Sequence, residues 1–266
     1  MPDLPIVVIS LAPQSPAVIS LVNSLANLGF TAEIFSAIDG RSAMPDLHDA
    51  ESVDQKMSVL RRRSEVTTSE VGCFLSHARV IRQAYDSGVE RILILEDDVE
   101  ILAGFAEVVD AIVSLPSEVE MVRLMGLKRR RRKTIATLAG SWQLVRPLRG
   151  WCGAQAYVMN RPAMDKFLRQ YQRISMPVDG FYDCFWETDI RAYGVEPHVA
   201  AERKHVSSIA KPWGTMAPSR MTEIRWRMFK LYRGVLMRYY RLANYSDFYP
   251  NTLPDPSIKF PRSNPD

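Results

Sequence analysis

The sequence has few cysteines and no long apolar run. Cys73, Cys152 and Cys184 are its three cysteines in 266 residues, and their odd number and wide spacing fit neither a disulfide framework nor a zinc-binding pattern. The longest apolar runs, such as residues 6–11, have the length of a β-strand and fall short of the roughly 20 residues that span a bilayer. The first five residues, MPDLP, contain an acid and no base. We therefore expect no signal peptide and a cytoplasmic location.

Glycine is missing where a dinucleotide site would need it. The chain opens with a predicted strand at residues 6–11 (IVVISL), a helix at 16–28 that ends before Gly29, and a second strand at 31–37. The turn between the first strand and the helix lacks the G-x-G-x-x-G pattern, so a dinucleotide fingerprint is not supported. A hydrophobic content of 47% is ample for a large core. The opening β-α-β pattern predicts an α/β fold.

Positive charge is scarce in most of the chain and concentrated in two segments. Residues 128–133 (KRRRRK) are all basic, and residues 201–266 contain 12 Lys and Arg against 5 Asp and Glu. The rest of the chain is acidic, which the net charge of +4 hides. Such basic segments predict an anionic partner, either membrane lipid or nucleic acid. Residues 128–133 are either a solvated loop or a loop that orders on a negatively charged substrate.

Three consecutive carboxylates follow the most strand-like segment of the chain. Residues 91–95 (RILIL) run directly into Glu96, Asp97 and Asp98. The apolar run predicts a strand covered on both faces, and ligands of such sheets bind beyond the carboxyl ends of the strands. Adjacent carboxylates that are half buried repel one another unless a cation or hydrogen bonds compensate. The triplet is therefore either a divalent-metal site or a solvated acidic turn before a helix that begins near Gly104.

A helix is predicted directly before this strand. Residues 67–88 offer Thr68 or Ser69 as the N-cap and Gly88 as the stop, with an apolar face made by Val71, Phe74, Leu75, Ala78 and Ile81. We expect this face to pack on the sheet and His77 to point elsewhere. His77 has either a structural hydrogen bond or a catalytic role.

The middle of the chain predicts further strands and helices around a few exposed acids. Residues 41–63 lack a clear period and predict a surface excursion, whereas strands are predicted at 119–125 and 142–145, and helices at 104–115, 161–171 and 181–193. Residues 176–180 (MPVDG) form a turn that presents Asp179. The helix at 181–193 would carry Asp183 and Glu187 on one face, with Asp189 beyond them. Three aromatic residues could stack on a ligand or lie in the core, namely Trp151, Tyr157 and Trp186.

The C-terminal part of the chain is basic and aromatic. Residues 219–243 interleave Arg and Lys with Trp, Phe, Tyr, Leu and Met at helical spacing, which predicts a basic amphipathic helix. This helix either packs on the domain or lies on an anionic membrane surface. Residues 250–266 are rich in proline and predict a disordered tail.

Several segments together resemble glycosyltransferase family 25, the lipooligosaccharide and collagen-type sugar transferases. The resemblance runs from about residue 5 to 210, and its most specific feature is EVGCFLSH at 70–77 followed about fifteen residues later by LEDDV at 95–99. The other matching segments are residues 9–11 (ISL), 35–40 (FSAIDG), 153–159 (GAQAYVM) and 177–179 (PVD).

The resemblance implies an inverting, metal-dependent transferase with a GT-A-like α/β fold, whose central sheet is mixed and mostly parallel. It implies a nucleotide-sugar donor, UDP-galactose or UDP-glucose, and Mn²⁺ or Mg²⁺ at the donor diphosphate, which suits oxygen ligands. The expected metal ligands are Asp98, Asp97 and His205. The expected donor-binding residues are Ser10, Leu11, Asp39, Ser76, His77, Glu96 and Asp97.

An inverting transferase also needs a base that removes the proton of the acceptor hydroxyl. Asp179 is the first choice because the family match covers it. Glu187 and Asp189 compete, since Trp186-Glu187-x-Asp189 is similar to the Trp-plus-acid acceptor segments of other inverting transferases. These three residues are the candidate catalytic acids.

The sequence thus predicts a hexosyltransferase that acts on a glycolipid such as lipopolysaccharide, or on another oligosaccharide, at the inner face of the cell membrane. We expect a catalytic domain over residues 1–212, a basic helical appendage over 213–245 and a Pro-rich tail over 246–266. A nucleic acid is an unlikely partner. The alternatives are a non-catalytic membrane- or nucleic-acid-binding protein that uses its basic segments, and a metal-dependent phosphohydrolase built on Asp97 and Asp98.

Overall fold

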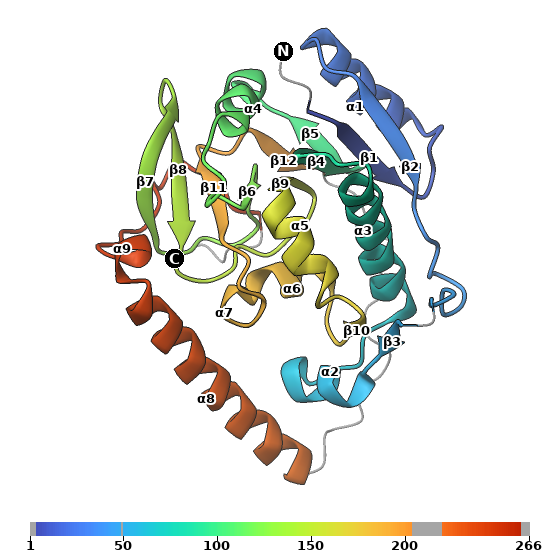
Figure 1. The fold of residues 1–266 in the computed structure, drawn as a ribbon, viewed down its shortest axis with the longest axis vertical. Helices are drawn as coiled ribbons and strands as arrows, with labels where there is room; N and C mark the ends of the chain where they lie inside the picture. The colour runs from blue at the N-terminus through green and yellow to red at the C-terminus, as the bar shows by residue number, and fades with distance from the viewer. Residues whose placement is uncertain (1–3, 49, 204–219, 262–266) are drawn as a thin grey trace.

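The protein folds around a mixed sheet of eight strands in the order β2-β1-β4-β9-β6-β11-β8-β7 (Figure 1). The structure is a computed structural model and describes all residues except 1–3, 49, 204–219 and 262–266. Strands β2, β1, β4, β6, β11 and β7 run in one direction, and β9 and β8 run in the other. This confirms the predicted mixed α/β class.

The strands of the main sheet lie far apart in the sequence. They are β1 (Ile6–Ser10), β2 (Ala32–Ser36), β4 (Arg91–Glu96), β6 (Met121–Arg123), β7 (Arg132–Ala139), β8 (Trp142–Pro147), β9 (Ala156–Asn160) and β11 (Ala192–Glu196). Two small sheets pair β3 (Ser52–Val53) with β10 (Arg173–Ile174) and β5 (Val99–Ile101) with β12 (Ala200–Glu202).

Helices cover both faces of the sheet. They are α1 (Pro16–Asn27), α2 (Gln55–Arg62), α3 (Thr68–Asp86), α4 (Phe105–Val113), α5 (Arg161–Leu168), α6 (Val178–Asp183), α7 (Phe185–Thr188), α8 (Arg220–Ala243) and α9 (Tyr245–Phe248). Ile92 and Ile94 of β4 face the core formed with α3, α5 and α6. Leu93 and Leu95 face the opposite core, formed with α1 and α4. The predicted strand covered on both faces is therefore confirmed.

Helix α3 packs directly against the segment that follows β2. Thr67 is its N-cap, one residue earlier than expected, and forms a capping box with Glu70. A Cβ on Gly40 would lie 2.0 Å from the Thr68 carbonyl oxygen, and a Cβ on Gly72 would lie 2.6 Å from the Ile38 carbonyl oxygen. Because neither glycine has a Cβ, the backbone of the loop after β2 packs directly against α3. This contact positions the loop on the helix that leads into β4.

Three regions differ from the sequence prediction. The expected excursion at 41–63 contains α2, whose N-cap Asp54 accepts a hydrogen bond from the Met57 N–H, a signal that basic composition concealed. Part of the KRRRRK segment begins strand β7, because Glu196 neutralises Arg132 at 2.7 Å. The helix predicted at 181–193 is divided into α6 and α7, and its last residues enter β11. Gly194 is needed there because its missing Cβ would lie 2.0 Å from Trp151.

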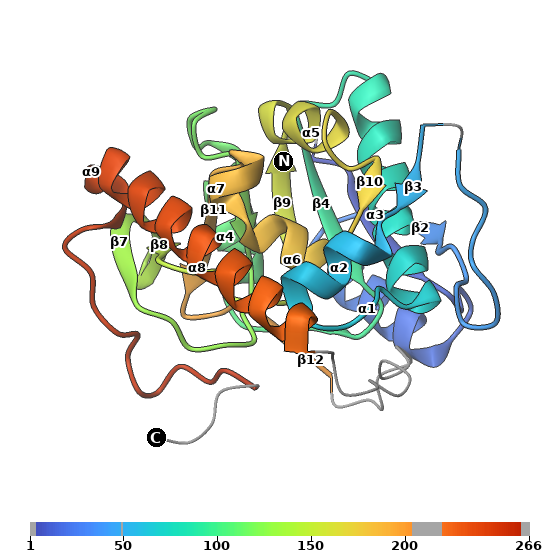
Figure 2. The ribbon, with the colours of Figure 1, turned by 90° about the horizontal axis from the view of Figure 1, so that it is seen from below.

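The C-terminal helix α8 begins beside α2 and runs along one side of the domain, past α7 (Figure 2). Arg233 on its inner side donates to Glu187 of α7 at 2.6 Å. Its outer side exposes apolar residues, among them Met228, Leu231 and Tyr239. Within the described part of the chain, no helix is both long and apolar enough to cross a bilayer.

The first part of the expected disordered tail is bound to the domain. Thr252 forms a β-bridge with Arg132, and the side chain of Arg131 donates to Asn251 at 2.7 Å. Phe260 is buried against Trp151. The proline content is compatible with this order because the segment is held at a few points, at Asn251, Thr252 and Phe260, and its described residues form no helix.

Candidate active site

The parallel strands β2, β1 and β4 end beside one another at a cavity of about 190 Å³. Its lining combines the ends of these strands with one side of α3. The lining residues are Ile9, Ser10, Leu11, Ala12, Ala37, Ile38, Gly40, Arg41, Ser69, Cys73, Ser76, His77, Glu96 and Asp97. The structure therefore brings six of the seven expected donor-binding residues into one cavity, namely Ser10, Leu11, Ser76, His77, Glu96 and Asp97. It is hereafter the strand-end cavity.

Ser10 connects the end of β1 to the acidic triplet. Its buried hydroxyl donates to Asp97 Oδ2 at 2.5 Å and accepts from the Ala12 N–H at 2.9 Å. A single side chain thus fixes both the turn after β1 and the orientation of the Asp97 carboxylate. The partner of Asp97 comes from a position 87 residues away in the sequence.

Asp98 is the least compensated member of the triplet. Its Oδ1 atom is buried and has no hydrogen-bond partner among the described residues. Burial, followed by the nearby carboxylates of Glu96, Glu202 and Asp97, raises the pKa of Asp98 to about 8. Leaving such a group unpaired is costly, and a bound cation would remove that cost. The solvated acidic turn considered above does not describe this residue.

His77 is fully buried and faces the sheet, contrary to the expectation that it points elsewhere. Its Nδ1 lies 2.8 Å from the Tyr157 hydroxyl and its Nε2 lies 3.3 Å from Glu96 Oε1. The Tyr157 hydroxyl in turn lies 2.8 Å from that of Tyr182. Helix α3 is buried on nearly all of its sides, so the prediction that one apolar face alone packs on the domain was wrong. This chain of polar groups orients Glu96 at the end of β4.

Ser76 lies in the opposite wall of the strand-end cavity, and Asp39 lies at its rim. The Ser76 hydroxyl accepts from the Ile38 N–H at 2.8 Å and donates to the Gly72 carbonyl oxygen at 2.7 Å, so Ser76 holds the loop after β2. Asp39 is exposed and forms an ion pair with Arg41 at 2.6 Å. Hydrogen bonds from Arg41 lower the pKa of Asp39 to about 2. Asp39 is thus a fixed anion at the rim and does not itself line the cavity.

Asp179 and Asp183 lie one turn apart on α6 and hold the loop before β9. The Gly153 N–H donates to Asp179 Oδ2 at 3.1 Å, and the Cys152 N–H donates to Asp183 Oδ2 at 3.2 Å. Asp183 is further paired with the buried Arg123 at 2.7 Å. Asp179 lines a second cavity, of about 680 Å³, and has no cationic partner among the residues described.

Cys73 lies between the two regions. Burial raises its pKa well above the ordinary value, and the carboxylates of Glu96, Asp179 and Asp98 raise it further. All three carboxylates are therefore close enough to act on one thiol. The sulfur of Cys73, a ring nitrogen of His77 and a carboxylate oxygen of Glu96 lie within 4.8 Å of one another. The sequence pattern does not single out Cys73, because Glu96 and Asp179 come to it from β4 and α6.

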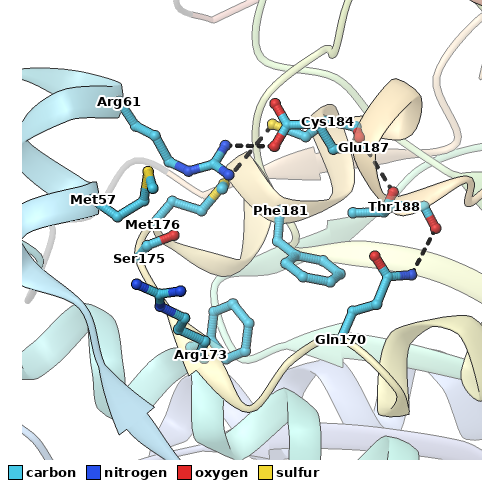
Figure 3. A pocket seen from close by; sticks show the side chains of 11 residues that line it. Met57, Arg61, Gln170, Arg173, Ser175, Met176, Phe181, Cys184, Glu187 and Thr188 are labelled. Atoms are coloured by element: carbon cyan, nitrogen blue, oxygen red, sulfur yellow. Dashed lines mark hydrogen bonds and ion pairs between the residues drawn. The ribbon is translucent and has the colours of Figure 1, made fainter. Parts of the chain in front are cut away.

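Glu187 is occupied by two cations. Arg61 of α2 lies 2.7 Å from its Oε2, and Arg233 of α8 lies 2.6 Å from its Oε1. Figure 3 shows Arg61 and Glu187 directed toward each other beside Cys184 and Met176. The expected shared face with Asp183 is absent because α6 ends before α7 begins. Glu187 therefore ties α8 to the domain, and its contacts do not favour a role as a base.

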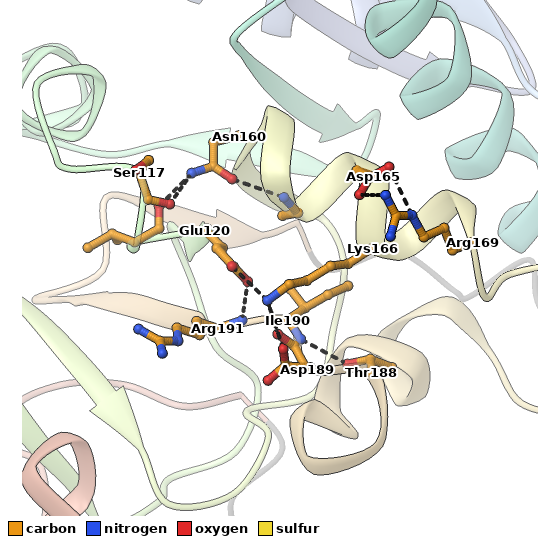
Figure 4. A network of polar contacts seen from close by, with 12 residues as sticks. Ser117, Glu120, Asn160, Asp165, Lys166, Arg169, Thr188, Asp189, Ile190 and Arg191 are labelled. Atoms are coloured by element: carbon orange, nitrogen blue, oxygen red, sulfur yellow. Dashed lines mark hydrogen bonds and ion pairs between the residues drawn. The ribbon is translucent and has the colours of Figure 1, made fainter. Parts of the chain in front are cut away.

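Asp189 belongs to a separate network on the surface. It ends α7 in a left-handed conformation, with φ of 55°, and its exposed carboxylate lies 3.0 Å from Lys166 Nζ. Lys166 also pairs with Glu120, which accepts from the Arg191 N–H (Figure 4). These contacts fix the entry to β11 and do not favour Asp189 as a base.

Two further residues complete the surroundings of the triplet. Glu202 of β12 acts on the pKa of Asp98, and Gln155 donates to Glu202 at 3.3 Å. Pairing of β12 with β5 brings Glu202 here, a contact that the sequence pattern does not reveal. His205, the third expected metal ligand, lies outside the described residues. Of the aromatic candidates, Trp151 and Tyr157 are fully buried in the core.

Comparison with known proteins identifies the family. The model of glycosyltransferase family 25 (LPS biosynthesis protein) matches residues 3–182. The "Probable inactive glycosyltransferase 25 family member 3" of Bos taurus is 27% identical over 216 residues, which cover 73% of this chain and 36% of that protein. The "Inactive glycosyltransferase 25 family member 3" of Mus musculus is 25% identical over 222 residues, with the same shares. The chain thus spans little more than a third of the length of these relatives.

Solved structures align at low identity. A197 from STIV aligns with a TM-score of 0.39 and 11% identity over 79% of this chain and 98% of that one. A glycosyltransferase involved in the glycosylation of the major capsid of PBCV-1 aligns with a TM-score of 0.30 and 11% identity over 62% of this chain and 63% of that one. Since the family model matches from residue 3 to residue 182, across both the strand-end cavity and Asp179, the chain belongs to glycosyltransferase family 25.

Proposed function

We propose that the protein is an inverting, metal-dependent hexosyltransferase that moves galactose or glucose from a UDP-sugar to a saccharide acceptor of a cell-surface glycolipid such as lipopolysaccharide. The observation that carries this proposal is the unpartnered, buried Oδ1 of Asp98, two residues after the end of β4. Asp98 does not line the strand-end cavity itself, but the preceding Asp97 does, at the carboxyl ends of parallel strands, where nucleotides bind in open α/β sheets.

Asp98 and Asp97 are the residues that would hold a divalent cation. Asp98 offers an oxygen without a partner among the described side chains, and Asp97 is the neighbouring carboxylate. Oxygen ligands of this kind suit Mn²⁺ or Mg²⁺. A bound cation would neutralise charge on the departing nucleoside diphosphate. His205 remains a candidate third ligand.

The remaining roles, binding of the nucleotide and removal of the acceptor's proton, fall to residues of the chain itself. Leu11, Ile38 and Gly40 provide backbone and apolar surface for the nucleotide in the strand-end cavity, and Asp39 is the candidate anion for the ribose hydroxyls. Asp179 is the candidate base, because the N–H groups of Gly153 and Gly180 orient its carboxylate at 3.1 and 2.7 Å. A base at this place would take the proton of the acceptor hydroxyl.

We place the enzyme at the cytoplasmic face of the membrane. The outer side of α8 combines exposed Met221, Ile224, Met228, Leu231 and Tyr239 with basic residues. Apolar and basic side chains on one helix suit the headgroup region of an anionic bilayer. The contacts of α8 with α2 and α7 are compatible with this, since they use its inner side.

A non-catalytic role is the second candidate, because both mammalian relatives are named inactive. In that case the basic segments would bind a membrane or nucleic acid, and the acidic triplet would only be structural. This alternative predicts salt-dependent binding that is indifferent to Asp98.

Nucleotide release separates the two candidates. The protein is incubated with a panel of nucleotide sugars, Mn²⁺ and a glycolipid acceptor, and free nucleotide is measured. We expect release from one hexose donor, its loss with EDTA, and a decrease of at least about 100-fold in Asp98→Asn. Asp86→Asn, an exposed carboxylate at the end of α3, is the matched control and should remain active. Nucleotide release that is unchanged both by EDTA and by Asp98→Asn would contradict the proposal. So would the absence of nucleotide release from every donor.

A further inference from the structure

The second cavity, of about 680 Å³, lies between the domain and α8, and seven of its nineteen lining residues are Lys or Arg. Lys128 and Arg130 reach it from the loop before β7, Arg149 from the loop after β8, and Lys230 from α8. The only acids in its lining are Asp179 and Asp183, as far as the structure describes the chain. We call it the α8 cavity.

Part of this positive charge is not neutralised by the protein. Arg61 and Arg233 pair with Glu187, and Arg62 pairs with Glu70. In contrast, Lys128, Arg149 and Lys230 have no ion pair with any residue that the structure describes. Several unpaired cations around one hollow favour an anionic ligand.

Aromatic surface lies among these cations. Trp186 and Trp226 both line the α8 cavity. The Lys230 ammonium lies 4.8 Å from the centre of the Trp226 ring, and the Arg233 guanidinium lies 5.4 Å from that of Trp186. Indole faces beside charged donors suit a ligand with an apolar sugar face and an ionised substituent.

The cavity adjoins the candidate base and is distinct from the donor site. It contains Asp179 and shares none of its lining with the strand-end cavity. Asp179, Glu96 and Asp98 nevertheless all act on the pKa of Cys73, after the effect of its burial. A saccharide in the α8 cavity would thus lie beside Asp179 without occupying the strand-end cavity.

We infer that the α8 cavity binds the acceptor, and that this acceptor is an anionic saccharide carrying a phosphate or carboxylate group. The inference rests on the proposed transferase function and adds the acceptor's chemical class. Lys128, Arg149 and Lys230 bind the ionised group, while Asp179 faces the hydroxyl that receives the hexose. Helix α8 is in this way a wall of the acceptor site as well as a surface element.

Calorimetric titration tests the inference without requiring turnover. The probes are glucose, glucose 6-phosphate and glucuronic acid, with UDP plus Mn²⁺ as the donor-site probe. We expect at least one anionic sugar to bind roughly tenfold or more tightly than glucose, because each charge-assisted contact is stronger than a neutral one. Lys230→Gln and Arg149→Gln should each weaken that binding about tenfold and leave UDP binding within about twofold.

Arg238→Gln is the matched control, because it removes the same charge from the exposed side of α8, outside the cavity. It should bind the anionic sugar as the wild type does. Equal affinity for glucose and both anionic sugars, no binding of any sugar, or an equal effect of Arg238→Gln would overturn the inference. A loss of UDP binding in Lys230→Gln would instead assign the cations to the donor. Failure of nucleotide release alone would contradict the proposed function and leave this titration unaffected.

Discussion

At the scale of single residues, the three adjacent carboxylates differ in what they contact. Asp97 accepts from Ser10, Glu96 lies against His77, and Asp98 keeps an unpartnered buried oxygen. The sequence predicted the triplet and its place after a buried strand. It could not distinguish the three roles, because Ser10 and Glu202 reach the triplet only through strand pairing.

His198 offers a residue-scale test of the packing around Trp151. Its ring centre lies 5.5 Å from that of Trp151 and 4.8 Å from that of Phe260, and burial lowers its pKa to about 4. Because the unfolded chain binds a proton near pH 6.5, acid favours unfolding from about pH 6.5 down to pH 4. We expect this group to cost on the order of 3 kcal/mol of unfolding free energy over that interval.

Denaturant unfolding of the wild type and His198→Phe between pH 7 and pH 4 measures this cost. The variant should lose less stability on acidification, so the difference between the two proteins should change with pH. A difference that stays constant across the interval would show that His198 is not buried as described.

At the scale of elements, two segments that carry the family resemblance, residues 35–40 and 70–77, contact each other. The contact is between the loop after β2 and helix α3. Gly40 and Gly72 allow the backbones to touch, and Ser76 holds the loop. Most strands and helices were predictable because hydrophobic period and end signals agree there. β7 and β11 were not, because an ion pair between distant residues and close packing on Trp151 decide them, and the N-cap signal of α2 was concealed by its basic composition.

Two glycine substitutions test this contact. Gly40→Ala places a Cβ 2.0 Å from a backbone oxygen, whereas a Cβ on Gly234 of α8 meets no atom within 4 Å. We expect Gly40→Ala to lower the unfolding free energy by about 1–3 kcal/mol and to weaken UDP binding. Gly234→Ala should be neutral or raise the unfolding free energy by up to about 1 kcal/mol. Equal stability of the two variants would contradict the close packing.

At the scale of the whole molecule, residues of the basic segments and the acidic side chains of Asp179 and Asp183 line the same cavity beneath α8. The uneven charge can be read from the sequence, and an anionic partner stays a prediction. That Lys128, Arg149 and Lys230 converge beside Asp179 could not be read from it, because it depends on how α8 crosses α2 and α7. We propose a division of labour in which the donor binds at the strand ends and the acceptor binds beneath α8.

The central claim is that the acidic triplet binds a divalent cation together with a nucleoside diphosphate. Electron paramagnetic resonance of free Mn²⁺, titrated with protein in the presence and absence of UDP, measures this directly. We predict that wild-type protein depletes the free signal, that UDP strengthens the binding, and that Asp98→Asn weakens it at least about tenfold, with Asp86→Asn unchanged. Equal Mn²⁺ binding by wild type and Asp98→Asn, with or without UDP, would contradict the account.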